Sequence, residues 1–201
     1  MQLDNNPNLK TQIIIFGGCF NPPTLAHQEI IKACLNLPDY KEVWLMPSAS
    51  GYNKKITTKD PQRITMLHLV KHYHFNNNPK LVISDFELKR PGLLETCHTV
   101  DALSNRYRNT NFWYAFGADS YVDMPNWGRG KELQSELNLI VFERNNVKPP
   151  TKTNVTPLYL FKYGHLSSTG ARKAVLRDAN LSYHVSPYVQ QYIKANNLYV
   201  E

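Results

Sequence analysis

The chain of 201 residues has few of the features that mark secreted, metal-binding or membrane proteins. Its three cysteines, Cys19, Cys34 and Cys97, lie far apart with no Cys-x-x-Cys spacing. This disfavours a disulfide framework or a zinc site and favours a reducing cytoplasm. No apolar run approaches the roughly 20 residues that a membrane span needs. Residues 1–10 are polar and rich in asparagine, so we expect no signal peptide there and predict a cytoplasmic protein.

Side-chain arrangements typical of several enzyme classes are also missing. The sequence has no serine–histidine–acid arrangement of motif strength and no conspicuous pair of carboxylates. His68, His72 and His74 stand close together, and the first two have the i, i+4 spacing of a helical metal site. We expect these histidines on the polar face of a helix instead, and we predict no protein side chain as a metal ligand.

The chain carries an excess of positive charge. Its formal net charge is +7, and its isoelectric point is near 9.2. Such a balance favours acidic partners, but nucleotides, nucleic acids and anionic surfaces all qualify. A nucleic-acid role would depend on charge alone, and we do not expect one. The length and the 42% hydrophobic content predict one globular domain over residues 1–201.

A glycine-rich stretch near the N-terminus is the most informative part of the sequence. Residues 13–16 are apolar and largely β-branched, as in a fully buried parallel strand. Gly17 and Gly18 follow, and they let the backbone turn tightly with its amides exposed to a ligand. Two consecutive prolines then keep the chain out of a helix. Thr24 is a good N-cap, and residues 25–35 are the predicted helix.

The start of this helix is a candidate anion site. Thr24 and His27 would both lie at its N-terminus, where unpaired N–H groups and the helix dipole favour an anion. The alternative is a buried strand–helix turn in which His27 only caps or packs. We favour the phosphate-binding interpretation.

Strands and helices alternate along the rest of the chain. The sequence predicts further strands at 43–47, 81–88, 111–116, 137–142 and 158–161, and further helices beginning near 60 and at 95–107, 169–177 and 187–196. A polar, proline-containing connection occupies 145–157. The alternation predicts a doubly wound, mostly parallel sheet with helices on both faces. Ligands of such sheets bind beyond the carboxyl ends of the strands, where the polar clusters of this chain fall.

A second helix start, Ser167-Ser168-Thr169 followed by Arg172, has groups that suit a polyphosphate. The hydroxyls could instead be ordinary caps, and the arginine a solvated charge.

Two further clusters follow buried strands. Gly117 could let an adenine lie against the backbone, and Asp119 could accept hydrogen bonds from ribose hydroxyls or simply cap a helix. Trp127 is either part of the core or a stacking surface for a flat ring.

These motifs resemble those of a known enzyme superfamily. Residues 17–27 resemble the (H/T)xGH signature of the nucleotidyltransferases, and residues 166–172 resemble their second signature, ISSTxxR. Together with Gly-Ala-Asp at 117–119 and with Trp127, they are similar to the pyridine-nucleotide adenylyltransferases. The resemblance runs in order over nearly the whole chain, including its C-terminal residues.

The sequence also departs from the pattern of this family. Ala26 replaces the usual glycine before His27, and Thr24 stands where many bacterial members have a histidine. The loop at 51–55 is similar to the eukaryotic version, whereas the helix start at Thr96 resembles the bacterial one. The choice between nicotinate and nicotinamide mononucleotide therefore stays open.

The resemblance implies a Rossmann-like fold that transfers AMP from ATP to a pyridine mononucleotide, with release of pyrophosphate. It implies Mg²⁺ bound through the ATP phosphates, and a helical part at about 165–201 that completes the ATP site. The implied catalytic residues are Thr24, His27 and Arg172; the ATP-binding residues are Gly17, Gly18, Cys19, Phe20, Gly117, Asp119, Ser167, Ser168 and Thr169; the mononucleotide-binding residues are Tyr52, Lys54, Thr96, Trp127 and Arg144.

Two other functions remain open from the sequence. One is a related transferase with another phosphorylated acceptor, such as phosphopantetheine. The other is a nucleotide-binding regulator without catalysis, against which the intact Thr24, His27 and Arg172 argue. The sequence allows a homo-oligomer but does not define one.

Overall fold

The computed structural model describes residues 10–49, 58–90, 95–159 and 162–200. The strands are β1 (Thr11–Gly18), β2 (Glu42–Pro47), β3 (Leu81–Ile83), β4 (Thr110–Gly117), β5 (Asn138–Phe142) and β6 (Val155–Leu158). The helices are α1 (Leu25–Leu35), α2 (Asp60–Phe75), α3 (Thr96–Arg106), α4 (Ala118–Asp123), α5 (Gly130–Glu136), α6 (Ser168–Leu176) and α7 (Pro187–Ala195), with short 3₁₀ turns η1 (Met124–Asn126) and η2 (Leu181–Tyr183).

The described strands form one six-stranded sheet in the order β3-β2-β1-β4-β5-β6. Every neighbouring pair is parallel, and Ile15 of the central strand β1 lies opposite Trp44 on one side and Tyr114 on the other. The chain runs outward from β1 to β3, then returns to β4 and runs outward to β6. This is the doubly wound arrangement, so the predicted fold class is confirmed. Its change of direction between β1 and β4 creates the crevice in which such sheets bind ligands.

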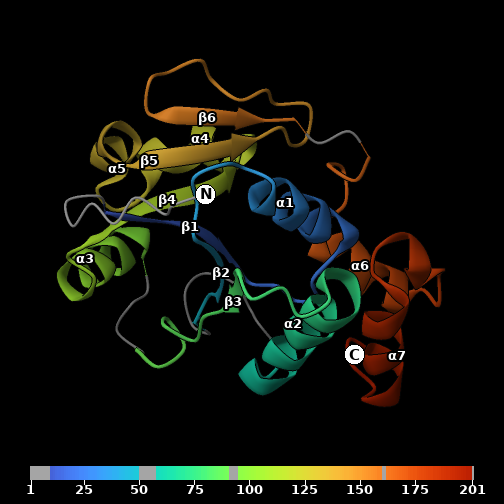
Figure 1. Ribbon diagram of the computed structural model, residues 1–201. Helices are drawn as coiled ribbons and strands as arrows, with labels where there is room; N and C mark the ends of the chain where they lie inside the picture. The colour runs from blue at the N-terminus through green and yellow to red at the C-terminus, as the bar shows by residue number, and fades with distance from the viewer. Residues whose placement is uncertain (1–9, 50–57, 91–94, 160–161, 201) are drawn as a thin grey trace.

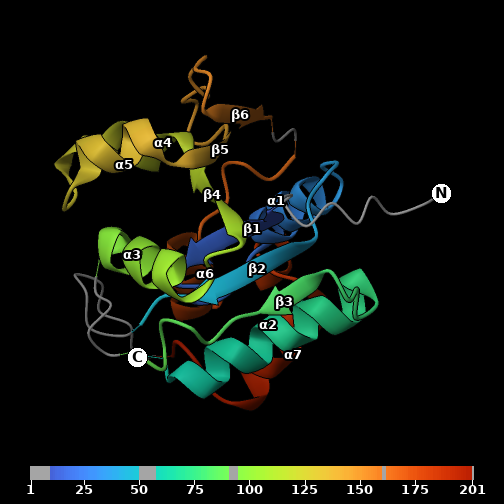
Figure 2. The same ribbon diagram turned by 60° about the vertical axis from the view of Figure 1, so that its left-hand side comes forward.

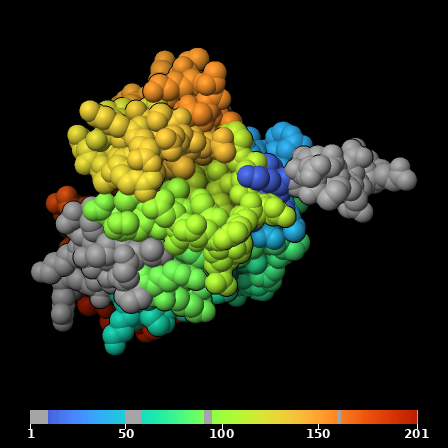
Figure 3. All heavy atoms as spheres, turned by 90° about the vertical axis from the view of Figure 1, so that its left-hand side faces the viewer, coloured from blue at the N-terminus to red at the C-terminus, as the bar shows by residue number. Residues whose placement is uncertain are grey.

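The sheet separates two hydrophobic cores. Along β1, Ile14 and Phe16 point into one core and Ile13 and Ile15 into the other, as the alternation of side chains along a strand requires. Helices α1, α2, α6 and α7 cover the first face, and α3, α4 and α5 cover the second (Figures 1 and 2). From the left side of Figure 1, α3 and the α4–α5 segment lie next to each other on the second face (Figure 3).

Two strands have bounds in the structure that differ from those predicted from the sequence. The strand expected at 81–88 is only the three residues of β3, because the chain after Ser84 forms turns in which the Lys89 N–H donates to the Asp85 carbonyl. The strand expected at 158–161 is instead β6, which includes Pro157. A proline fits there because β6 is at the edge of the sheet, where one row of backbone donors has no strand partner.

The segment between β4 and β5 contains helices that the sequence pattern did not reveal. Gly117 is the N-cap of α4, and Arg129 has the left-handed φ of 54° before α5. A Cβ on Gly130 would lie 1.7 Å from the Met124 carbonyl oxygen. Only glycine allows this close approach, which folds α5 back onto the preceding turn.

Helix α2 buries a charged residue. Ile64 is only half-buried, whereas the side chain of Arg63 is completely buried beside Leu67 and Val70. The guanidinium lies under the end of β1, where it bonds to backbone carbonyls. The three histidines considered above, at 68, 72 and 74, are exposed on the same helix, in agreement with the polar-face expectation.

The described residues contain neither a membrane-spanning helix nor a cluster of metal ligands. No described helix is both long and apolar enough to cross a membrane. No group of three or more histidine, cysteine, aspartate or glutamate side chains in this part of the chain is arranged to hold a metal ion.

Candidate functional site

A cavity of about 520 Å³ opens beyond the carboxyl ends of β1, β4 and β5. The starts of α1 and α6 form two of its walls. Residues from five separate segments line it, and those among the predicted site residues are Gly17, Gly18, Cys19, Phe20, His27, Gly117, Arg144, Ser167, Ser168, Thr169 and Arg172. His27 and Arg172, far apart in the sequence, therefore face the same cavity.

The turn between β1 and α1 forms the floor of this cavity. Phe20 is completely buried and has a left-handed φ of 46°, a conformation that bulky residues rarely adopt. Its ring packs edge-on against Phe16 and lies against His27, at centroid distances of 5.5 and 5.1 Å. These contacts hold the turn in a shape that the backbone alone would not favour.

Thr24 orients His27 and does not line the cavity. It is fully buried, and both its backbone N–H, at 2.9 Å, and its hydroxyl oxygen, at 2.8 Å, contact Nδ1 of His27. A backbone N–H can only donate, so Nδ1 is an acceptor and the proton of the neutral ring is on Nε2. The threonine therefore fixes the tautomer and direction of the imidazole, and its predicted contact with the phosphates stays a prediction.

The charge state of His27 is equally constrained. Burial lowers the pKa of His27 to about 3, and the positive charge of Arg144 contributes to the same shift. The imidazole is therefore neutral near pH 7. Its Nε2–H can donate a hydrogen bond, but the ring does not act as a general acid.

The start of α6 is joined to the start of α1 by hydrogen bonds. Ser167 is the N-cap of α6 and accepts from the Gly170 N–H at 3.1 Å. The Ser168 hydroxyl donates to the Pro22 carbonyl at 2.8 Å. Arg172 donates from Nη1 to the Asn21 carbonyl at 2.7 Å and from Nη2 to the Thr169 hydroxyl at 3.2 Å. The two helix starts are thus held as one unit around the cavity.

The ends of β4 and β5 supply an ion pair at the edge of the cavity. Asp119 accepts from the Ser120 N–H at 2.9 Å and from the Asn145 side chain at 3.0 Å, and its Oδ2 is 3.5 Å from Nε of Arg144. Arg144 lines the cavity, whereas Asp119 does not. A Cβ on Gly117 would lie 2.4 Å from Oδ1 of Asp119, so a larger residue at this position would displace the Asp119 side chain.

The predicted mononucleotide residues occupy a neighbouring region. Trp127 is half-buried, and its ring meets Phe116, a cavity-lining residue, edge-on at a centroid distance of 5.6 Å. Its Nε1 donates to Asp123 at 3.0 Å. Thr96 is the first residue of α3. Neither Trp127 nor Thr96 lines the cavity itself, and Tyr52 and Lys54 lie outside the described residues.

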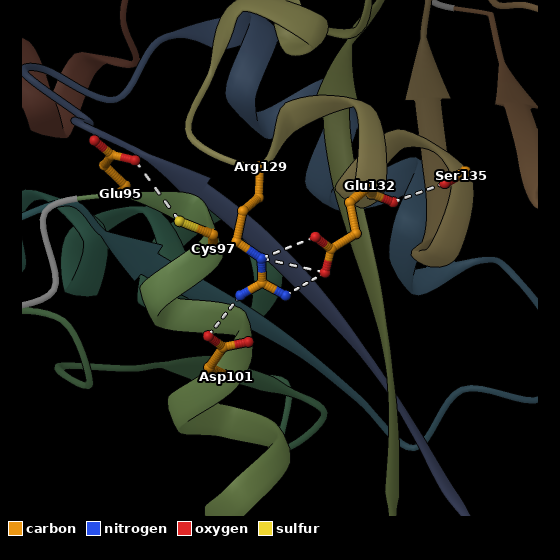
Figure 4. A network of polar contacts seen from close by, with 6 residues as sticks. All are labelled: Glu95, Cys97, Asp101, Arg129, Glu132 and Ser135. Atoms are coloured by element: carbon orange, nitrogen blue, oxygen red, sulfur yellow. Dashed lines mark hydrogen bonds and ion pairs between the residues drawn. The ribbon is translucent and has the colours of Figure 1, made fainter.

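A polar network fastens the segment that carries Trp127 to α3 (Figure 4). Arg129 donates to Asp101 of α3 at 2.7 Å and forms a bidentate pair with Glu132. A Cβ on Gly128 would lie 1.8 Å from a carboxylate oxygen of Glu95, the residue before α3. Trp127 and the start of α3 are therefore close together in space.

Two features of the site were not found from the sequence. Arg63 donates from Nη1 to the Cys19 carbonyl at 2.7 Å and from Nη2 to the Ser48 carbonyl at 2.8 Å. Tyr199 donates to the side chain of Asn21 at 2.7 Å. Both contacts join segments distant in the chain, and no local pattern of residues marks them.

The comparisons with known proteins agree with this geometry. Residues 15–174 match the family model described as cytidylyltransferase-like. The chain belongs to this family. A protein of Leptospira interrogans named as a probable nicotinate-nucleotide adenylyltransferase is 31% identical, over 92% of this chain and 95% of the relative. A protein of Shouchella clausii with the same name is 28% identical, over 94% and 96%. The chain thus falls in the branch of the family that carries this name.

Solved structures share the fold. The nicotinic acid mononucleotide adenylyltransferase of Plasmodium falciparum complexed with NaAD superposes with a TM-score of 0.84 at 23% identity, over 94% of this chain and 97% of that one. The same protein complexed with APC gives a TM-score of 0.81. At this level of identity the superposition confirms the architecture of the sheet and its helices.

Proposed function

We propose that the chain is a nicotinate-nucleotide adenylyltransferase of NAD biosynthesis. It transfers AMP from ATP to nicotinate mononucleotide and produces the deamido-NAD dinucleotide and pyrophosphate. The observation that carries the proposal is that His27 and Arg172, from two helix starts, face one cavity at the carboxyl ends of the strands. The names of the relatives support nicotinate mononucleotide, rather than nicotinamide mononucleotide, as the acceptor.

The reaction needs alignment and charge neutralisation rather than a covalent enzyme intermediate. A phosphate oxygen of the mononucleotide forms a bond to the α-phosphorus of ATP, and the bond from this phosphorus to the β-phosphate oxygen breaks. His27 would donate from Nε2 to an oxygen of the α-phosphate, where negative charge must be stabilised in the transition state. A neutral donor suits this role because it does not need to gain or lose a proton.

The β- and γ-phosphates would lie at the start of α6. Arg172, Ser168 and Thr169 would bind them together with the unpaired N–H groups of the helix. Arg144 would add positive charge at the opposite edge, near the acceptor phosphate. No carboxylate occurs among the described residues that line the cavity, so the lining as a whole favours anions.

The residues that line the cavity also determine how Mg²⁺ would be bound. The described cavity offers hydroxyls and backbone carbonyls but no aspartate or glutamate, so Mg²⁺ would be bound mainly by the phosphate oxygens of ATP. When bound, Mg²⁺ supplies further neutralisation of the triphosphate charge. The cysteines at 19, 34 and 97 are free thiols, which fits the reducing cytoplasm in which we place the reaction.

A product assay tests this function. The purified chain is incubated with ATP and Mg²⁺, and with nicotinate mononucleotide, nicotinamide mononucleotide or phosphopantetheine, and both pyrophosphate and the coupled product are measured. We expect pyrophosphate to appear with equimolar deamido-NAD, and faster than with either other acceptor. Turnover with phosphopantetheine alone would assign the related transferase, and ATP binding without turnover would assign a regulator.

A further inference from the structure

Tyr199, next to the last described residue, reaches the loop that forms the cavity floor. Its side chain is buried, and its hydroxyl donates to Oδ1 of Asn21 at 2.7 Å, across 178 positions of sequence. Thr58, also buried, hydrogen-bonds the same hydroxyl. The backbone of Tyr199 has a left-handed φ of 66°, which a bulky residue adopts only where its surroundings hold it. The tail is therefore fixed in place by this side chain.

Asn21 connects the tail to a cavity-lining cation. Its side chain accepts from Tyr199, and its backbone carbonyl accepts from Nη1 of Arg172 at 2.7 Å. Asn21 itself lines the cavity and is only 3% exposed. Any movement of Asn21 therefore moves the group that sets the direction of the Arg172 guanidinium.

The loop that contains Asn21 needs such contacts. The preceding residue, Phe20, has a strained left-handed backbone, and Arg63 donates to the Cys19 carbonyl at 2.7 Å. Tyr199 supplies a further contact to this loop, at Asn21. Burial raises the pKa of Tyr199 to about 12, so the hydroxyl remains a donor over the whole working range of pH.

We propose that Tyr199 is a positioning residue of the ATP site, which acts through Asn21 to direct Arg172 at the polyphosphate. This inference builds on the proposed function only in that ATP is the ligand of the cavity. It assigns a role in ligand binding to a side chain that does not line the cavity.

Substitution of Tyr199 by phenylalanine tests the proposal because it removes the hydroxyl and keeps the ring in the core. The dissociation constant of ATP is measured by calorimetry with Mg²⁺ and no acceptor. We expect it to rise about three- to tenfold, the effect of leaving one buried acceptor without its donor. In turnover, KM for ATP should rise by a similar factor, while KM for nicotinate mononucleotide stays within about twofold.

Tyr121→Phe is the matched control. Tyr121 is buried, and its hydroxyl has no hydrogen-bond partner among the described residues, so its removal should leave ATP binding unchanged. A merely structural role for Tyr199 would lower the melting temperature of Tyr199→Phe without changing the dissociation constant of ATP. That result would overturn the proposal, as would equal increases in KM for both substrates.

A double-mutant cycle with Asn21→Ala supplies a second test. If Tyr199 acts through Asn21, adding Tyr199→Phe to Asn21→Ala should weaken ATP binding no further. Fully additive effects would contradict the proposed route. The binding assay contains no acceptor, so failure of the acceptor assignment leaves its result interpretable, whereas a wild-type chain that binds no ATP would refute both proposals.

Discussion

The neutral state of His27 has a measurable consequence for the pH dependence of folding. Burial first, and then the charge of Arg144, lowers the pKa of His27 to about 3 from the ordinary value of 6.5. Between these two values the unfolded chain binds a proton that the folded chain does not. The free energy of unfolding therefore falls as the pH is lowered from about 7 toward 3.

The size of the effect follows from the shift. A histidine of this kind stays neutral in the folded state but becomes protonated in the unfolded state. As the pH is lowered from about 7.5 to about 5, the free energy of unfolding therefore decreases by about 2 kcal/mol. His27 as a whole residue is only partly buried, and screening by solvent places the expected loss at about 1–2 kcal/mol.

Urea unfolding at the two pH values, on the wild type and on His27→Gln, measures this contribution. Glutamine does not titrate, so the variant should lose about 1–2 kcal/mol less than the wild type over the same interval. His98→Gln replaces an exposed histidine on α3 and should keep the wild-type loss. Equal losses in the wild type and His27→Gln would refute a neutral, buried His27, as would an NMR titration that gives His27 an ordinary pKa.

Three further substitutions separate the roles of other residues. Trp127→Ala should raise KM for the mononucleotide at least about tenfold and KM for ATP little; equal increases would make Trp127 part of the core alone. Arg172→Lys keeps the charge but cannot keep both hydrogen bonds, at 2.7 and 3.2 Å, so KM for ATP should rise about tenfold. Arg63→Met removes the donor of the Cys19 and Ser48 carbonyls and the ion pair with Asp60, and it should lower the free energy of unfolding by about 3 kcal/mol in urea; a loss below about 1 kcal/mol would mean that water replaces the guanidinium.

Local chemistry explains the parts of the structure that the sequence predicted well. The apolar run of β1, the turn after it and the cap at Thr24 are all encoded by neighbours in the chain, and α1 begins and ends where expected. The alternation of strands and helices was enough to predict the doubly wound sheet. The starts of α1 and α6 could then be placed at one edge of this sheet without knowledge of the coordinates.

The parts that were missed depend on the position of an element in the sheet. β6 was placed too late in the chain because a proline argues against an interior strand, and the sequence does not say which strand is at the edge. The short helices α4 and α5 follow from a close approach at Gly130 rather than from an apolar pattern. Their length gives too little periodicity for recognition.

Within the site, the missed residues act across long separations. The burial of Arg63 depends on carbonyls that follow the ends of two strands, which no local pattern of residues marks. Thr24 was expected at the helix start, where it lies, but the contact of its hydroxyl with His27 was not part of that expectation. Tyr199 could be assigned to Asn21 only once the residues that follow α7 had been placed against the loop at Asn21.

A crystal structure of the chain with Mg²⁺ and a non-hydrolysable ATP analogue is the most direct test of how the site works. We expect the triphosphate to lie between the starts of α1 and α6, with Nε2 of His27 and the guanidinium of Arg172 both within hydrogen-bond distance of its oxygens. An analogue bound outside this cavity, or in contact with only one of these two residues, would contradict the proposed mechanism of adenylyl transfer.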